Sequence, residues 1–526
     1  MSLPDEQHAA PRVGPSAEGT LLTLAVLALV VVLLSIITFV PRGSGPDGRP
    51  IASGGGGGGG SDEGGDFGLG ADPAAADGGP GGAGGSSGGG GGTSGGGTSG
   101  GGGSAGALPN IDCKTGKNGG NTDTGVTGNS ILLGAVTVES GPGRSFLQPE
   151  TVAMQAVVSK VNSAGGICGR RIQLKLRDSG WDGSVGAQYI QNMVEGDKVF
   201  ALAVNPDSEG LEKASSSGYL GKQKVPVIGT DGLLYSQYTD PYIWPIATST
   251  VSAMHAIAES QHKSGKRHFS LVYETTYRFG REGANAYNNT VKKLTGNNIP
   301  GYSDPDKNPQ CAGRFCGIVA SQQAYGSNAN TINSACTNAP GCDAGAVLLE
   351  PATALTWFSS GGAFGGVSDP SGGAGAAPQP LFARSFADGC QRKCDNLRLW
   401  TGFNPPIEQF ASIPGVQQYM QDMKAFSSSV DVDNQFAEGA YLGMRLTVDV
   451  LTKASALGLT RENVVRILDS TSNYDIGLSV RPLTWSKGNH FPQATVHAFD
   501  ESYPAGFGGW HFVQGSTIDD PDPRRI

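Results

Sequence analysis

The chain has 526 residues, of which 84 are glycine, and a formal net charge of −9. Its balance of 37 Lys+Arg against 46 Asp+Glu lacks the basic footprint of a DNA- or RNA-binding protein, so that function class is excluded. A packed protein contains about 7% glycine, so part of this chain is not a folded domain. The rest is long enough for more than one core.

Residues 20–40 are predicted to form a single transmembrane anchor. The stretch Thr20–Val40 has 21 residues without a charge, and about 20 apolar residues in a helix span a bilayer core. Pro41 follows it instead of the small-residue cleavage site of a signal peptide, which is the alternative interpretation. Residues 1–19 would then be a short cytoplasmic tail. Positive residues usually lie on the cytoplasmic side, but here two arginines, Arg42 and Arg49, follow the segment and only Arg12 precedes it, which slightly favours the opposite orientation.

Residues 41–109 are predicted to be a disordered linker rich in glycine and serine. Glycine fills 33 of the 64 positions between 43 and 106, which leaves too little apolar surface to offset the entropy of ordering. A flexible coil of that length has a root-mean-square reach of about 40–48 Å. We therefore expect the folded part of the chain to begin near residue 110.

All eight cysteines follow the predicted anchor, and their even number indicates disulfides in an oxidising compartment rather than zinc sites. Only Cys390 and Cys394 have a spacing that a zinc knuckle admits, and the histidines are not clustered, so we expect neither a metal nor a cofactor. This places the large C-terminal part outside the cell membrane, in a single-pass protein. Three pairs of successive cysteines are close in sequence and predict local disulfides, which leaves two cysteines for one longer-range disulfide. The predicted disulfides are Cys311–Cys316, Cys336–Cys342, Cys390–Cys394 and Cys113–Cys168.

From residue 110 onward, apolar runs typical of buried strands alternate with helical patterns. Strands are predicted at Ile131–Val138, Ile172–Leu176, Val199–Val204, Val225–Gly229, His268–Glu274, Gly345–Glu350, Pro380–Phe386 and Ala494–Asp500. Helices are predicted from Pro149 to Gly165 and at Ser184–Glu195, Ser252–Ser264, Arg281–Leu294 and Asn434–Leu457. Such alternation indicates an α/β fold with parallel sheets. About 400 residues exceed one core, so two sheets are expected.

Several segments resemble one family. The most specific is the turn Asn162–Ile172, which reads NSAGGICGRRI; the others are Ile131–Val136, Ser140–Pro142, Leu459–Val465, Asp475–Leu478 and Pro482–Ser486. Together they resemble the leucine-binding-protein-like family of type I periplasmic solute-binding proteins, the receptors of ABC importers for branched-chain amino acids and amides. The resemblance covers about residues 130–500.

The resemblance implies a solute-binding domain over residues 110–512, made of two Rossmann-like lobes that are joined by three crossovers and hold a ligand in the cleft between them. Lobe 1 would comprise about 128–249 and 388–475, and lobe 2 about 250–387 and 476–512, with a C-terminal tail at 513–526. Subunits of an ABC permease would be the membrane partners.

Open α/β sheets bind ligands at the C-terminal ends of their strands, where the loops carry Ser140, Ser208, Thr230, Asp231, Tyr277 and Glu350. In the resembling family, hydroxyls and amides of lobe 1 take an α-carboxylate, which assigns that role to Ser208 and Thr230. An acid of lobe 2 pairs with the ammonium, and Glu350 is the candidate.

This sequence departs from the family's pattern at Asp207 and Asp231, where small neutral residues are usual. Either these aspartates face water or the ligand is not a plain amino acid, and a cationic ligand is expected if they line the cleft. The alternatives are structural. Ser208 and Thr230 could cap the following helices, Glu350 could be only a helix-start acid, and Tyr277 could serve packing.

The folded sequence contains no nucleophile elbow, H-E-x-x-H, P-loop or paired CxxC motif, so an enzyme is not expected. The sequence therefore predicts a membrane-anchored, extracytoplasmic solute-binding protein of an ABC-type importer. Its ligand would be a small polar solute such as an amino acid or amide. An extracytoplasmic ligand sensor and a structural cell-surface protein are the alternatives.

Overall fold

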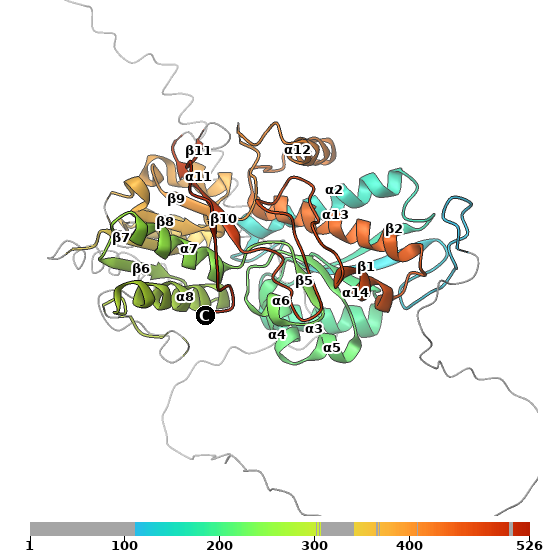
Figure 1. Ribbon diagram of the computed structural model, residues 1–526. Helices are drawn as coiled ribbons and strands as arrows, with labels where there is room; N and C mark the ends of the chain where they lie inside the picture. The colour runs from blue at the N-terminus through green and yellow to red at the C-terminus, as the bar shows by residue number, and fades with distance from the viewer. Residues whose placement is uncertain are drawn as a thin grey trace, which may run out of the picture. The chain divides into compact units, whose positions relative to one another are not determined.

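The computed structural model describes residues 111–300, 302–304, 306, 341–363, 367, 369–407, 409–503 and 509–526 (Figure 1). The predicted anchor, the predicted linker and Cys311, Cys316 and Cys336 lie outside these residues. Among the described residues, no helix is both long enough and apolar enough to cross a bilayer.

The first sheet forms lobe 1 and is entirely parallel. Its strands, in the order β2-β1-β3-β4-β5, are Arg171–Asp178, Ser130–Thr137, Ala201–Ala203, Val227–Thr230 and Ile243–Pro245. Residues 133–137 of strand β1, which lies between β2 and β3, are all buried, as expected for a strand that is covered on both faces. The two longest strands pair from Ser130↔Arg171 to Thr137↔Asp178, so the family-like turn ends where β2 begins.

The second sheet forms lobe 2 and mixes parallel with antiparallel pairing. Its parallel part is β6 (Phe269–Tyr273), β7 (Ala344–Leu348), β8 (Gly375–Pro378) and β9 (Arg398–Thr401). The antiparallel strands β10 (Thr495–Glu501), β11 (Trp510–Phe512) and β12 (Ile518–Asp519) complete it. The residues of the predicted C-terminal tail thus include a strand that pairs with β10.

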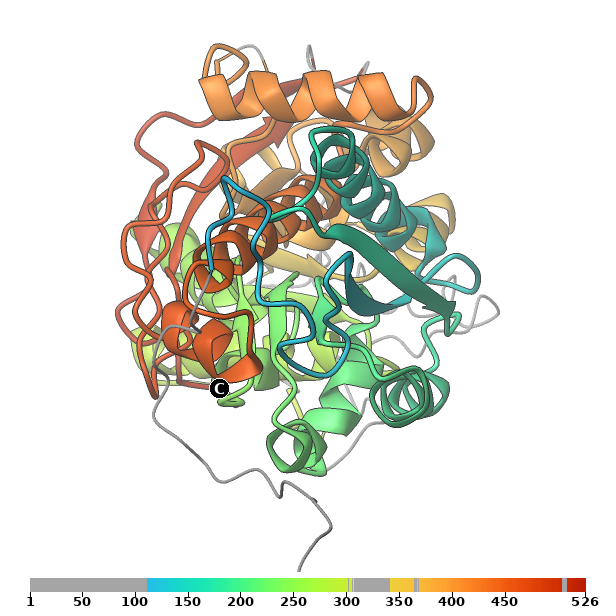
Figure 2. The same ribbon diagram turned by 90° about the vertical axis from the view of Figure 1, so that its right-hand side faces the viewer.

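Helices cover both faces of the lobe 1 sheet. One face carries α3 (Gly183–Gln191), the π-helical turn Asn192–Asp197, α4 (Ser208–Ser216) and α5 (Tyr219–Gln223). The other carries α2 (Arg144–Ser163), α12 (Pro414–Phe426), α13 (Gln435–Ser455) and α14 (Arg461–Leu468). Figure 2 shows α13 beside α2, and the backbones of β4 and α13 meet at Gly229 and Gly443.

In lobe 2, α7 (Thr250–Lys263) and α8 (Arg278–Thr295) pack against each other, as do α10 (Pro351–Ser359) and α11 (Arg384–Cys390). Lobe 2 also contains short 3₁₀ turns at Ser371–Gly373, Gln379–Leu381 and Gln391–Cys394. The short helix α6 (Ser236–Thr239) belongs to lobe 1. Figure 1 shows the two sheets in separate lobes.

Three sequence predictions differ from the structure. The predicted strand Pro380–Phe386 is a 3₁₀ turn followed by α11, and the strand is instead β8, whose sequence GAAP has weak strand propensity. Strand β9 lies in the lobe 2 sheet, so the chain returns to lobe 1 after Thr401 rather than near residue 388. The chain then leaves lobe 1 near Gln493 rather than at residue 476, because Leu483 and Trp485 still lie in the lobe 1 core. Helix α2 begins at Arg144, which places Pro149 inside the helix rather than at its first position.

The three connections between the lobes meet at one point, which we call the hinge. Gly402, in the second connection, lies against Thr248 of the first and Gln493 of the third. A Cβ on Gly402 would come within 2.6 Å of the Thr248 hydroxyl oxygen, so a larger residue would have to displace the Thr248 or Gln493 side chain. The expected three-crossover topology is therefore present.

Two of the four predicted disulfides lie within the described residues. Cys113–Cys168 joins the entry segment to the turn before β2, and Cys390–Cys394 closes the end of α11. Both predictions are confirmed. Cys342 is also disulfide-bonded. Its expected partner Cys336, like the pair Cys311–Cys316, lies outside the described residues.

Candidate functional site

The C-terminal ends of the lobe 1 strands include a strained turn. Val204 and Asn205, directly after β3, both have left-handed backbones with φ of 59° and 56°, which is costly for a β-branched residue. Asn205 stabilises the turn, because its Oδ1 accepts from the Val136 N–H at 3.0 Å. Strain of this kind persists where the surrounding structure over-determines it, and it clusters at functional sites.

An aromatic contact joins the two lobes at this edge. The rings of Trp181, between β2 and α3, and Tyr277, before α8, stack with centroids 3.9 Å apart. Phe146 of α2 meets Trp181 edge-on at 5.3 Å. The apolar core of lobe 2 thus continues into lobe 1 through Val138, Phe146, Leu147, Trp181, Leu233 and Leu234. The lobes are closed on each other in this structure.

Each lobe also extends a carboxylate to a backbone amide of the other. Glu209 Oε1, in α4, accepts from the Arg278 N–H at 2.8 Å, and Glu282 Oε1, in α8, accepts from the Tyr235 N–H at 2.7 Å. Burial between the lobes raises the pKa of Glu209 to about 7 and that of Glu282 to about 8. Both carboxyls therefore titrate near neutral pH while the lobes are closed.

The predicted hydroxyl residues of lobe 1 have three different environments. The exposed Ser140 donates to Asp178 Oδ2 at 2.7 Å, so its hydroxyl is bonded within its own lobe. The buried Ser208 accepts from Trp181 Nε1 at 3.4 Å and is the first residue of α4, whose cap is Asp207. Thr230 caps no helix, and its fully buried hydroxyl has no hydrogen-bond partner among the described residues.

Asp207 and Asp231 are both buried but play different parts. Asp207 Oδ1 caps α4 by accepting from the Gly210 N–H at 2.9 Å, and Oδ2 lies so close to Gly186 that a Cβ there would be 1.8 Å away. Asp207 therefore fits between α3 and α4. Asp231 Oδ1 accepts from the Leu233 N–H and from Gln237 Nε2, while Oδ2 has no partner among the described residues. Burial raises the pKa of each to about 6.

The predicted residues of lobe 2 lie at the ends of β6 and β7. Tyr277 stacks on Trp181 and so contacts the opposite lobe. Glu350 accepts from the Ala352 and Thr353 N–H groups and caps α10, as the helix-start alternative predicted. Glu274 lies close enough to Glu350 for the two carboxylates to interact, and burial raises the pKa of Glu274 to about 7.

Sequence reasoning missed Glu150 and Trp181. Glu150 belongs to the second turn of α2 and is fully buried, and neither of its carboxylate oxygens has a hydrogen-bond partner among the described residues. Burial and, second, the charge of Asp231 raise its pKa well above the ordinary value. The sequence showed Glu150 only as an acid in a first helical turn. Trp181 carried no signal, because its left-handed backbone (φ 67°) and its partner in lobe 2 are tertiary features.

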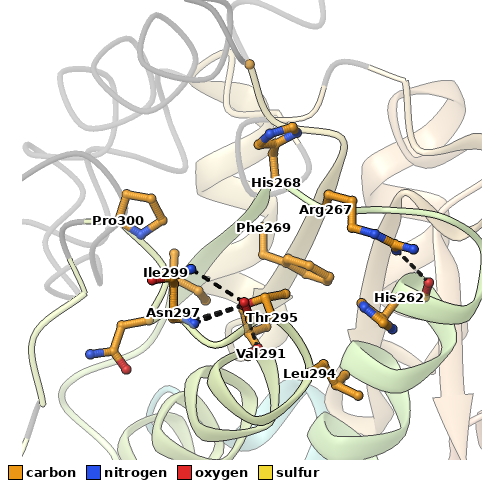
Figure 3. A pocket seen from close by; sticks show the side chains of 12 residues that line it. His262, Arg267, His268, Phe269, Val291, Leu294, Thr295, Asn297, Ile299 and Pro300 are labelled. Carbon is orange, nitrogen blue, oxygen red and sulfur yellow. Dashed lines mark hydrogen bonds between the residues drawn. The ribbon is translucent and has the colours of Figure 1, made fainter.

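A cavity of about 620 Å³ lies in lobe 2 at the N-terminal end of the parallel strands, between the start of β6 and the end of α8. This end is opposite to the strand ends that face lobe 1. Figure 3 shows Arg267 there, turned toward the carbonyl of His262, to which it donates at 2.9 Å. Parallel α/β sheets bind ligands at the C-terminal ends of their strands. The facing strand ends of the two lobes are therefore the better candidate site.

The comparisons with known proteins agree with this geometry. The family model described as "Periplasmic binding protein" matches residues 130–499. The chain belongs to the periplasmic binding protein family. Members of this family are non-enzymatic solute-binding proteins, which confirms both the predicted resemblance and the prediction that the chain is not an enzyme.

Similar solved structures share the fold at low identity. A fatty acid ABC transporter substrate-binding protein from Thermomonospora curvata has a TM-score of 0.60 and 17% identity, over 78% of this chain and 97% of that chain. A branched chain amino acid ABC transporter protein from Thermus thermophilus with bound valine has a TM-score of 0.60 and 12% identity, over 75% and 98%. A leucine binding protein from Thermotoga maritima has a TM-score of 0.56 and 14% identity, over 74% and 99%. No curated protein matches the chain in sequence.

Proposed function

We propose that this chain is the solute-binding protein of an ABC-type importer, and that it binds a small polar solute between its two lobes. Amino acids and amides are the first candidates, from the family resemblance. The observation that carries the proposal is the set of contacts between facing strand ends, in which Trp181 stacks on Tyr277 and Glu209 reaches the Arg278 amide. Two lobes that are joined by three connections at one hinge can open and close around a ligand by changes confined to the hinge.

Transport is favoured because several similar structures are named as ABC transporter proteins, with valine or 4-hydroxybenzoate bound in two of them. Those ligands differ widely, so neither is carried over to this chain. Permease subunits in the membrane would be the partners. We further propose that residues 20–40 anchor the protein and that residues 41–109 tether an extracytoplasmic binding domain.

A thermal-shift screen of the full-length protein in detergent tests solute binding. A ligand that binds the native state at 100 times its Kd stabilises it by about 2.7 kcal/mol. The panel consists of amino acids, amides, polyamines and sugars. If none of these solutes raises the melting temperature, the result contradicts the proposed function.

The anchor has a separate test. Full-length protein should remain in the membrane fraction of intact cells, with residues 111–526 accessible to external protease. A soluble mature form that begins within the glycine-rich tract would show that residues 20–40 are cleaved.

A further inference from the structure

Two buried acids at the lobe interface have no counter-charge. Glu150 is fully buried and Asp231 is 4% exposed, and no Lys, Arg or His among the described residues forms an ion pair with either. The two carboxyl groups interact with each other, and Asp207 and Tyr238 are the other titratable groups that interact with Asp231. Three of the four carboxylate oxygens have no hydrogen-bond partner within the described structure.

An independent observation comes from the neighbouring hydroxyl. Thr230, directly before Asp231, is fully buried, and its Oγ1 also has no partner among the described residues. Buried polar groups are nearly always hydrogen-bonded, so the unpartnered oxygens of Glu150, Thr230 and Asp231 require an explanation. A bound solute that supplies several hydrogen-bond donors would satisfy all three side chains.

The carboxylate of Asp231 is held in a fixed orientation. Its Oδ1 accepts from the Leu233 N–H at 3.1 Å and from Gln237 Nε2 at 2.9 Å, and the Gln237 Oε1 accepts from the Gly232 N–H at 2.9 Å. This network leaves Oδ2 as the free oxygen. A preorganised acceptor of this kind binds a donor without losing conformational entropy on binding.

Both acids lie directly beneath the interface between the lobes. Phe146 and Leu147 precede Glu150 in α2, and Leu233 and Leu234 follow Asp231; all four apolar residues pack into the core that continues from lobe 2. Helix α10 of lobe 2 also packs near α2. Separation of the lobes therefore uncovers the surroundings of both carboxyls, which gives a solute access.

We infer that Glu150 and Asp231 bind a cationic group of the solute, an ammonium or a guanidinium, and that the solute is an organic cation. This inference rests on the proposed solute-binding function and narrows its ligand class. An α-carboxylate at Thr230 would instead lie beside two acids and meet like charge. Burial raises the pKa of both carboxyls in the closed protein without solute, so the binding of a cation should favour the release of protons from them.

The test is calorimetric titration of the full-length protein with three four-carbon probes that differ in charge: 1,4-diaminobutane, 4-aminobutanoate and butanamide. The dication should bind most tightly. Glu150→Gln and Asp231→Asn should each weaken it by at least roughly 30-fold, as expected when one partner of a buried charged contact is removed. Glu501→Gln is the matched control, because Glu501 is also a buried acid with an unpartnered oxygen but lies at the end of β10.

A second readout is the number of protons released on binding, obtained by titration in two buffers of different ionisation enthalpy. The unsubstituted protein should release more protons than Glu150→Gln. Melting temperatures of the free variants show whether they fold. Tighter binding of 4-aminobutanoate than of the dication, or dication binding that neither substitution weakens, would overturn the inference but leave the proposed function intact. If no solute class binds at all, the proposed function itself fails.

Discussion

Removal of the Trp181 side chain should shift the protein toward a state with open lobes. Trp181 is folded within lobe 1 but stacks on Tyr277 of lobe 2 at 3.9 Å, and its ring plane is also nearly parallel to that of Phe279 at 6.2 Å. Such aromatic pairs contribute about 0.5–1.5 kcal/mol each beyond the burial of their area. We therefore expect Trp181→Ala to weaken lobe closure by about 1–3 kcal/mol.

That loss can be converted into a change in affinity. If only the closed state holds solute tightly, the apparent Kd increases as the closed state is depopulated. At 1.4 kcal/mol per tenfold change, the expected increase is up to roughly 5- to 150-fold, and it reaches these values when the open state predominates without solute. The assay combines titration of an identified solute with energy transfer between one fluorophore on each lobe, measured without solute.

Trp357→Ala is the control, since Trp357 is fully buried within lobe 2 and donates to the Ala363 carbonyl at 2.8 Å, without a ring contact to lobe 1 among the described residues. Large buried side chains cost about 3–5 kcal/mol when truncated to alanine, so both variants should melt earlier. Only Trp181→Ala should change the distance between the lobes. If both variants lower the melting temperature alike and neither changes that distance, Trp181 is a core residue and the reasoning about closure is refuted.

Three further predictions concern pH, the disulfides and one glycine contact. Closing raises the pKa of Glu209 to about 7 and of Glu282 to about 8, so the protein takes up protons when the lobes close. The closed population should therefore be greatest below about pH 4.5 and fall as the pH rises through 7–8. Energy transfer between the lobes from pH 4 to 9 measures this population, and a constant signal would contradict the prediction. In the chain-entropy model, loss of the Cys113–Cys168 disulfide, with a sequence separation of 55, should lower the free energy of unfolding by about 4 kcal/mol. Loss of Cys390–Cys394, with a separation of 4, should lower it by about 2 kcal/mol. Denaturant unfolding of the two double-serine variants measures both losses, and a larger loss for Cys390–Cys394 would refute the prediction. Gly443→Ala would bring a Cβ within 2.1 Å of the Gly229 carbonyl oxygen, and the overpacking should lower the free energy of unfolding by about 1–3 kcal/mol; an unchanged unfolding midpoint would show that β4 and α13 separate freely.

Local pattern in the sequence predicted most of the α/β architecture. Strands such as Ser130–Thr137 and Ala344–Leu348 consist mainly of apolar and small residues, because both faces of a parallel sheet are covered, and that requirement is visible residue by residue. The turn at Asn162–Ile172 carried the family resemblance in its glycines and its Arg170, which binds three carbonyls of the entry segment. The disulfide that joins Cys168 of the same turn to Cys113 was predicted from the spacing of the cysteines.

The tertiary structure alone decided the site. Glu150 has the sequence signature of an ordinary helical acid, and only the packing of α2 beneath the lobe interface turns it into a buried carboxyl whose pKa the charge of Asp231 helps to raise. Strand β9 joined lobe 2 through pairing with β8 and with β10, and β10 lies nearly a hundred residues away. Burial, electrostatic pairs and contacts between lobes depend on residues that are distant in sequence. Local periodicity reports which face of an element is covered, but it does not report what covers that face.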